Sequence, residues 1–123
     1  MLSRFPIALG AVFALVGVML GAFGAHALNE KLTASEMIDV WKTAVAYQMW
    51  HALALLFLGV LGPAIRIHAS TICFALGILL FSGSLYWLSL GGPRWLGPIT
   101  PLGGLLLIGG WGTLIASALR KSR

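Results

Sequence analysis

The sequence predicts an all-α integral membrane protein, a four-helix bundle with short loops that forms one domain over residues 1–123. Of its residues 59% are hydrophobic and only 9% are charged, whereas about 25% are charged in a typical soluble domain. The charges leave four uncharged stretches, which are 5–29, 43–65, 67–93 and 95–119. About 20 apolar residues in a helix cross the ~30 Å hydrocarbon layer, so each stretch can cross once. None alternates in polarity as the strands of a membrane β-barrel do.

The first helix is predicted over residues 5–28. Its end, GAFGAHAL at 21–28, follows one arginine and an apolar run, which is also the outline of a signal peptide with a small-x-small cleavage site. The apolar region of a signal peptide has about 7–15 residues, and this run is longer. It carries Gly17, Gly21 and Gly24, and stripes of small residues let membrane helices approach closely. We therefore expect a retained helix that packs through these three glycines.

The second helix is predicted over residues 34–61. Residues 33–36, Thr-Ala-Ser-Glu, match a capping box in which Thr33 is the N-cap and Glu36 bonds back to it. The first turns are amphipathic, so the helix is expected to begin among the headgroups and to enter the hydrocarbon near Ala44. Gly62 and the proline after it end the helix.

The third and fourth helices are predicted over residues 67–90 and 98–119. A short turn at Arg66 precedes the third helix, and the sequence GGPRW at 91–95 forms the turn before the fourth. Gly103 and Gly110 in the fourth helix are expected to admit a neighbouring helix or another subunit.

The distribution of Lys and Arg predicts the orientation. The side that carries both termini holds five of them, Arg4, Arg66, Arg120, Lys121 and Arg123, and the other side holds three, Lys31, Lys42 and Arg94. By the positive-inside rule both termini are expected in the cytoplasm. The net charge of +5 does not indicate nucleic-acid binding, because the basic residues are scattered singly or stand at helix ends.

Polar side chains inside membrane helices are costly, so each is a candidate for function. Tyr47, Gln48 and His51 share one stripe of the second helix. A rise of 1.5 Å per residue places His51 about 10 Å below the outer interface and gives Ser82 of the third helix a similar depth. The ligand-binding hypothesis for the outer half of the bundle includes Tyr47, Gln48, His51, Ser82, Tyr86, Thr100 and His26.

Two interpretations of these groups stay open. They can hydrogen-bond across helices and fix the packing, each bond contributing about 0.6 to 2 kcal/mol. Alternatively they line a shallow outward-facing pocket for a small molecule, a lipid headgroup or a proton, with His51 as the switch. His26 either stands at the headgroup level or as a cap, or shares that pocket. A metal site of His26 and His51 is disfavoured, because no carboxylate or cysteine falls at the same depth.

The predicted spans lack the residues that several classes of membrane chemistry require. No Asp or Glu lies inside a span, which disfavours a carboxylate proton relay, and no Ser–His–acid set falls at one depth. We predict no catalytic residue, no metal and no cofactor. Cys73 is one thiol and is expected to be a small buried apolar residue. An enzyme stays an alternative, since a lone histidine can act as a general base.

Four motifs carry a family resemblance, and they are GAFGAHAL, YQMWHALALL, FSGSLYWLSL and GPITPLGGLLLIGGW. Together they resemble the YgdD/YwdK-like family of small bacterial inner-membrane proteins of unknown function, to which the eukaryotic transmembrane protein 256 group is similar. The resemblance covers nearly the whole chain. It implies a four-helix protein of the bacterial inner membrane and no assigned reaction. The family's recurrent motifs correspond here to Gly21, Gly24, His26, Tyr47, Gln48, His51, Gly83, Ser84, Thr100, Pro101 and Gly103.

The sequence therefore predicts a small-ligand- or lipid-binding accessory protein of the membrane, with membrane lipid as a partner and no nucleic acid. A homo-oligomer or a larger membrane complex is a further hypothesis. One alternative function is a small transporter or channel, although Leu55 and Leu58 below His51 interrupt a polar path. Another is a structural subunit or assembly factor that uses its glycine faces.

Overall fold

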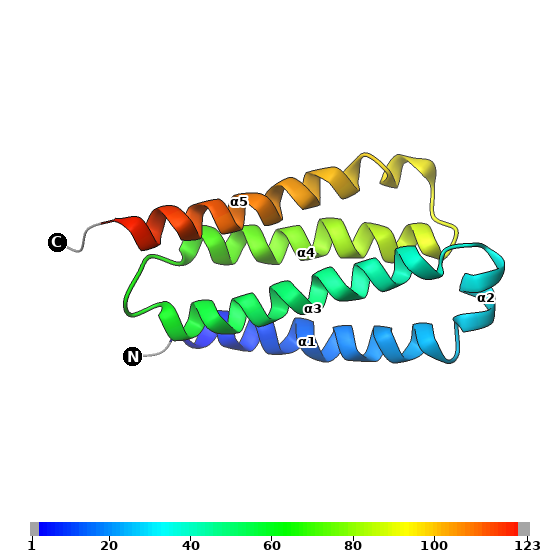
Figure 1. The fold of residues 1–123 in the computed structure, drawn as a ribbon, viewed down its shortest axis with the longest axis horizontal. Coiled ribbons are helices and arrows are strands. Elements are labelled where there is room, and N and C mark those ends of the chain that lie inside the picture. Colours follow the sequence, from blue (N-terminus) through cyan, green and yellow to red (C-terminus); the bar gives the residue numbers. More distant parts are fainter. Residues whose placement is uncertain (1–2, 121–123) are drawn as a thin grey trace.

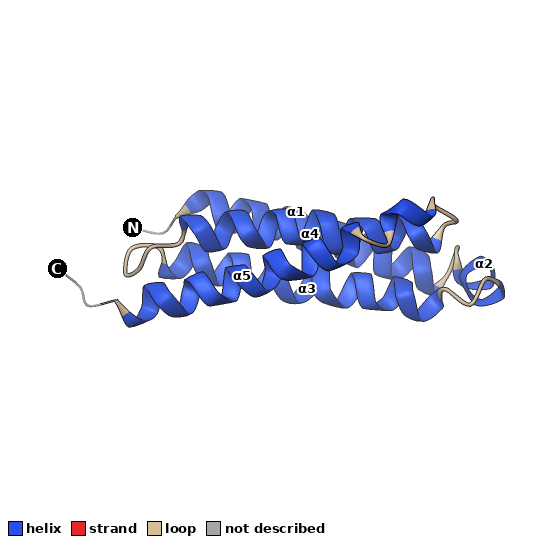
Figure 2. Ribbon diagram, turned by 90° about the horizontal axis from the view of Figure 1, so that it is seen from above, coloured by secondary structure: helices blue, strands red, loops and turns tan. Residues whose placement is uncertain are grey.

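The computed structural model describes residues 3–120, which form four long helices joined by short turns (Figure 1). The elements are α1 Arg4–Ala25, α2 Asn29–Ala34, α3 Ile38–Leu61, α4 His68–Ser89, the 3-10 turn η1 Arg94–Leu96 and α5 Ile99–Leu119. The start of α1 and the end of α5 lie at one end of the bundle, and α2 lies at the opposite end (Figures 1 and 2). We call the latter the α2 end.

Four segments are long and apolar enough to cross a membrane. They are α1, α3, α4 and the segment Arg94–Leu119, which contains η1 and α5. Large apolar side chains cover their outer faces; for example, Leu15 is 63% exposed, Phe57 67% and Ile108 68%. Contiguous apolar surface on this scale belongs against lipid or another protein. The predicted all-α membrane four-helix bundle is confirmed.

The long helices pack chiefly in chain order, so that α3 contacts α1 and α4, and α4 also contacts α5. Figure 1 shows the long helices side by side in the order α1, α3, α4 and α5, with α3 and α4 in the middle. The central core consists of Ala54, Leu55, Leu58, Ile67, Phe74, Ile78 and Leu107. Because α1 and α5 are the outermost helices, each has a broad face left for lipid.

Glycines allow α1 to lie close against α3. Gly10, Gly17 and Gly24 are buried and lie seven residues apart, which is about two helical turns. A Cβ at Gly10 would stand 2.6 Å from the carbonyl oxygen of Ala52. Gly21 is half-buried and lies at the edge of this interface, where a Cβ would only touch Val45 at 3.4 Å.

A second set of glycines serves the contact between α4 and α5. A Cβ at Gly103 would overlap the backbone of Phe81, and a Cβ at Gly110 would stand 2.6 Å from the ring of Phe74. Gly77 of α4 faces Leu107 in the same way, at 2.5 Å. Gly103 therefore lies against the backbone of α4, while Gly110 and Gly77 make room for the side chains of Phe74 and Leu107.

The predicted capping box is wrong. Thr33 lies inside the six-residue α2, Glu36 adopts a left-handed φ of 60°, and the long helix starts only at Ile38. Leu32 in α2 is fully buried, and its carbonyl accepts a hydrogen bond from the amide of Met37 at 2.8 Å. Burial of Leu32 thus outweighs the local capping signal, which is worth about 1 kcal/mol.

The other helix ends differ little from the prediction. The first helix stops at Ala25 and not at residue 28, because a turn begins at His26. The third and fourth predicted helices, 67–90 and 98–119, correspond to α4 and α5 within one residue at each end. The one-residue differences at α4 and α5 carry no structural meaning, whereas α1 ends three residues before its predicted end.

Candidate functional site

Gln48 joins three helices in the α2 half of the bundle. Its side-chain amide donates to the carbonyl oxygen of Phe13 in α1 at 2.8 Å, and its Oε1 accepts the hydroxyl of Tyr86 in α4 at 2.7 Å. A Cβ on Gly17 would stand 3.5 Å from Gln48 Nε2. The glycine therefore leaves room for the amide to reach the backbone of α1.

His51 is held by two partners. Its Nδ1 lies 2.7 Å from the carbonyl oxygen of Tyr47, and its Nε2 lies 3.0 Å from the indole Nε1 of Trp111 in α5. A carbonyl can only accept and an indole N–H can only donate. The imidazole is therefore neutral, with its proton on Nδ1, and links α3 to α5.

Three further hydrogen bonds connect neighbouring helices at this level. Ser82 of α4 donates to the carbonyl oxygen of Ala44 in α3 at 2.7 Å. The Ser84 hydroxyl lies 2.6 Å from that of Thr100 in α5. The indole of Trp41 donates to the carbonyl oxygen of Leu20 in α1 at 2.9 Å. Each hydrogen bond gives a partner to a polar group that would otherwise face hydrocarbon unpaired.

Tyr47 and His26 stand apart from these bonds. The ring of Tyr47 packs against Phe81 and Trp50, with centroid distances of 4.6 and 5.0 Å, and its hydroxyl makes no hydrogen bond to residues 3–120. His26 is the exposed C-cap of α1. Because both ring nitrogens of His51 are engaged, that side chain has no free lone pair to share with His26 in a metal site.

Five of the seven predicted site residues take part in hydrogen bonds between helices in this structure. Within residues 3–120, every buried side-chain nitrogen and oxygen has a hydrogen-bond partner, and the described part holds no cluster of three His, Cys, Asp or Glu side chains. Gln48, His51, Ser82, Tyr86 and Thr100 turn toward neighbouring helices and bond there. A ligand pocket lined by these groups stays a prediction.

Several partners of these polar groups lie beyond what the sequence pattern indicated, whereas Tyr86, which bonds Gln48, is itself a predicted site residue. Trp111 is one that a signal could have found, because an indole in mid-membrane needs an acceptor for its N–H and so indicates a bond to another helix. The acceptors Phe13, Leu20 and Ala44 contribute backbone carbonyls, which no side-chain pattern reveals.

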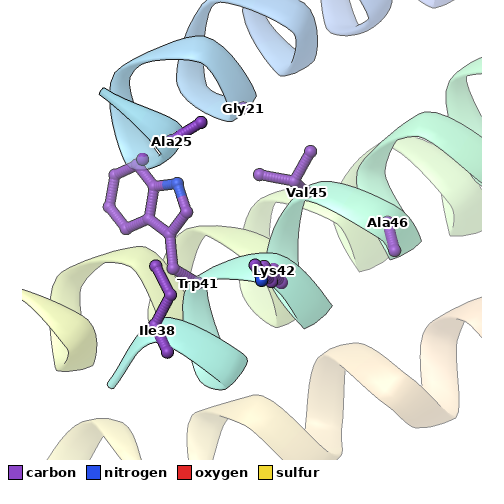
Figure 3. A pocket seen from close by; sticks show the side chains of 8 residues that line it. Gly21, Ala25, Ile38, Trp41, Lys42, Val45 and Ala46 are labelled. Atoms are coloured by element: carbon purple, nitrogen blue, oxygen red, sulfur yellow. The ribbon is translucent and has the colours of Figure 1, made fainter. Parts of the chain in front are cut away.

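A cavity of about 200 Å³ lies elsewhere, between α1 and α3 at the α2 end (Figure 3). It contains none of the seven candidate ligand-binding residues. Its lining comes from Gly21, Gly24, Ala25, Ile38, Trp41, Lys42, Val45 and Ala46. Since Trp41 already donates its N–H to Leu20, the charged group of Lys42 is the one side-chain polar group of this lining without such a bond to residues 3–120.

Small residues on α1 create this cavity. Gly24 lies directly against the indole of Trp41, which fills one side of the space, while Gly21 contributes no side chain to the other. Ala25 and Lys42 at the rim are exposed, so the cavity is accessible from the surroundings of the bundle. Figure 3 shows Val45 pointing toward α1 beside Gly21, with Trp41 on the opposite side.

Comparisons with known proteins place this architecture among membrane proteins without an assigned function. The model of a family described as a protein of unknown function, DUF423, matches residues 20–104. The chain is 47% identical to a UPF0382 membrane protein of Staphylococcus haemolyticus, over 93% of this chain and 94% of that protein. It is 40% identical to the UPF0382 inner membrane protein YgdD of Escherichia coli K12, over 100% of this chain and 95% of that protein. No solved structure matches the chain at a significant level.

Proposed function

We propose that this chain, which belongs to the DUF423 family of proteins of unknown function, is an accessory protein that binds a membrane lipid in the cavity between α1 and α3. The membership confirms the resemblance drawn from the four sequence motifs. It also identifies the chain as a multi-pass protein of the inner membrane. The observation that carries the proposal is the apolar, laterally accessible cavity at the α2 end.

The chemistry of the cavity suits an acyl chain. Apart from Lys42, the side chains that line it are aliphatic or the indole of Trp41. An apolar cavity of about 150 Å³ stays dry and can hold a molecule as large as benzene, so a cavity of about 200 Å³ has room for several methylene groups. A polar small molecule would find few donors or acceptors there.

The hydrogen-bonded network supports the same function, because its polar groups are already bonded within the protein and are not free for a polar ligand. The side-chain groups of Gln48 bond α1 and α4, and those of His51 bond α5 and a carbonyl of its own helix. Binding a polar ligand would therefore require breaking bonds such as Tyr86 to Gln48. Lipid in the cavity requires no such rearrangement. In this proposal the network fixes the rotation of the helices, and the fixed helices keep the cavity open.

A transporter or channel has less support. Toward the other end of the bundle from His51, the fully buried side chains of Leu55, Leu58 and Phe74 fill the space between the helices. A permeating polar solute would have to displace these apolar groups. A structural subunit would instead use the broad outer faces of α1 and α5, which carry exposed apolar side chains such as Leu15 and Ile108.

Replacing Gly21 by leucine is expected to remove the bound lipid. A Cβ there touches only Val45 at 3.4 Å, so the backbone needs no shift, and the rest of the leucine side chain extends into the cavity. The measurement is native mass spectrometry of protein extracted in a gentle detergent, with the fraction of lipid-bound protein as the readout. We expect the wild type to retain lipid and the Gly21→Leu variant to lose most of it.

The matched control is Gly83→Leu. Gly83 is exposed on α4, a Cβ added there would meet nothing within 4 Å, and the residue does not line the cavity. This variant has the same change of side chain in a membrane helix and is expected to retain lipid like the wild type. Equal retention by the wild type and both variants contradicts the proposal, and a co-purifying protein chain in place of lipid favours the structural-subunit alternative.

A further inference from the structure

We infer that Lys42 makes this cavity selective for anionic glycerophospholipids, with the lipid phosphate at the Lys42 ammonium and one acyl chain beside Gly21 and Val45. The inference rests on the proposed function, because it assigns a headgroup to the lipid that the cavity holds. It gives a binding role to a residue whose charge otherwise bears only on the orientation of the chain in the membrane.

The cavity is expected to span the boundary between headgroups and hydrocarbon. Lys42 directly precedes the uncharged stretch 43–65 and is the fifth residue of α3. A helix of 24 residues, such as α3, is about 36 Å long, which exceeds the ~30 Å hydrocarbon layer. We therefore expect the first turns of α3 at the phosphate level, where a lysine extends its ammonium while its stem lies on apolar surface.

The lining residues form two levels along the helices. Lys42 and Ala25 stand nearer the headgroups, and Gly21 and Ala46 stand about one turn deeper, since four residues rise ~6 Å. Figure 3 shows Lys42 on α3 next to Val45, with Gly21 on the facing helix α1. A molecule with an anionic head joined to an apolar chain matches this order of groups.

The charge of Lys42 is available to such a head. No ion pair holds it within residues 3–120, although Asp39 and Glu36 lie nearby along the chain, and both of these acids are exposed. Basic pockets between membrane helices bind anionic lipid headgroups. Phosphatidylethanolamine also carries a phosphate, but its own ammonium would be repelled by Lys42, so a net negative lipid such as phosphatidylglycerol is favoured.

The test measures which lipid the protein keeps. The full-length protein is reconstituted in bilayers of equal parts phosphatidylglycerol and phosphatidylethanolamine with matched acyl chains, then extracted gently and analysed by native mass spectrometry. We expect the bound phosphatidylglycerol to exceed the bound phosphatidylethanolamine by about fivefold, as one lysine near a membrane surface allows. In Lys42→Gln the ratio is expected to fall to about one, and in Lys42→Arg it is expected to persist.

Lys31→Gln is the matched control. Lys31 is an exposed lysine of α2 at the same end of the bundle, and it does not line the cavity. This variant is expected to keep the wild-type ratio. Far-UV circular dichroism of each variant checks that the helical fold is unchanged.

The outcomes separate the headgroup assignment from the lipid site itself. A wild-type ratio near one, or an unchanged ratio in Lys42→Gln, overturns the assignment to Lys42 even if Gly21→Leu still loses its lipid. An equal loss of selectivity in Lys31→Gln also overturns it, because general surface charge would then be the cause. If Gly21→Leu retains its lipid with the wild-type ratio, the cavity is not the site, and the proposed function fails together with the inference.

Discussion

Replacing Gly103 by alanine is expected to destabilise the bundle by about 1–3 kcal/mol, the usual cost of forcing an extra methyl group into a packed interface. The new Cβ would overlap the backbone nitrogen of Phe81 and stand 2.7 Å from the carbonyl carbon of Leu80. These are backbone atoms of α4, so the clash is relieved only if α4 and α5 move apart. The measurement is the free energy of unfolding in mixed micelles, followed by circular dichroism.

The same substitution at Gly83 is the control and is expected to have the opposite sign. A Cβ on Gly83 meets nothing within 4 Å. Alanine is favoured over glycine inside a helix by up to about 1 kcal/mol, so Gly83→Ala should be neutral or stabilising. If both variants show the same change in the free energy of unfolding, α4 and α5 do not touch through Gly103 as described.

Replacing Gln48 by leucine is expected to cost about 1–3 kcal/mol, because it removes the bonds to both α1 and α4 and leaves the hydroxyl of the half-buried Tyr86 without its acceptor. Tyr86→Phe removes only one of these bonds, and about 0.6 to 2 kcal/mol is expected for it. The double variant is expected to be no less stable than Gln48→Leu alone, since the second change removes a group that is already unpaired. A double-mutant cycle of unfolding free energies measures this coupling.

Tyr47→Phe serves as the control for that cycle. It also removes a tyrosine hydroxyl, but the hydroxyl of Tyr47 forms no hydrogen bond to residues 3–120. We expect little change in stability. Additive effects of Gln48→Leu and Tyr86→Phe would mean that the two side chains do not bond each other in the membrane.

The sequence identifies the polar residues of the membrane interior more successfully than it identifies what they do. Gln48, His51 and Ser82 stand out because polar groups are rare and costly there, and all three are buried in the bundle. Their partners are the Tyr86 hydroxyl on α4, an indole on α5 and backbone carbonyls on α1 and α3. Which group a side chain reaches depends on how each helix is rotated about its axis, and periodicity within one helix does not fix that rotation relative to its neighbours.

The cavity was beyond sequence reasoning for a related reason. The stripe of small residues predicts that Gly21 packs together with Gly17 and Gly24, yet the interface follows the seven-residue spacing from Gly10 and leaves Gly21 at its edge. The space beside Gly21 exists because this glycine has no side chain and Trp41 fills only one side of it. Nothing in the sequence pattern brings Lys42 next to that glycine.

The sequence by itself determined the membrane class, the four spans and the family, because the cost of placing a residue in hydrocarbon is nearly independent of its distant neighbours and adds up along each span. The tertiary structure decided that α2 is a separate helix followed by a left-handed Glu36, that His51 bonds Trp111, and that the accessible cavity lies beside Lys42. These features depend on the burial of Leu32 and on the relative rotation and depth of whole helices. Such quantities belong to pairs of helices, and no single stretch of sequence contains them.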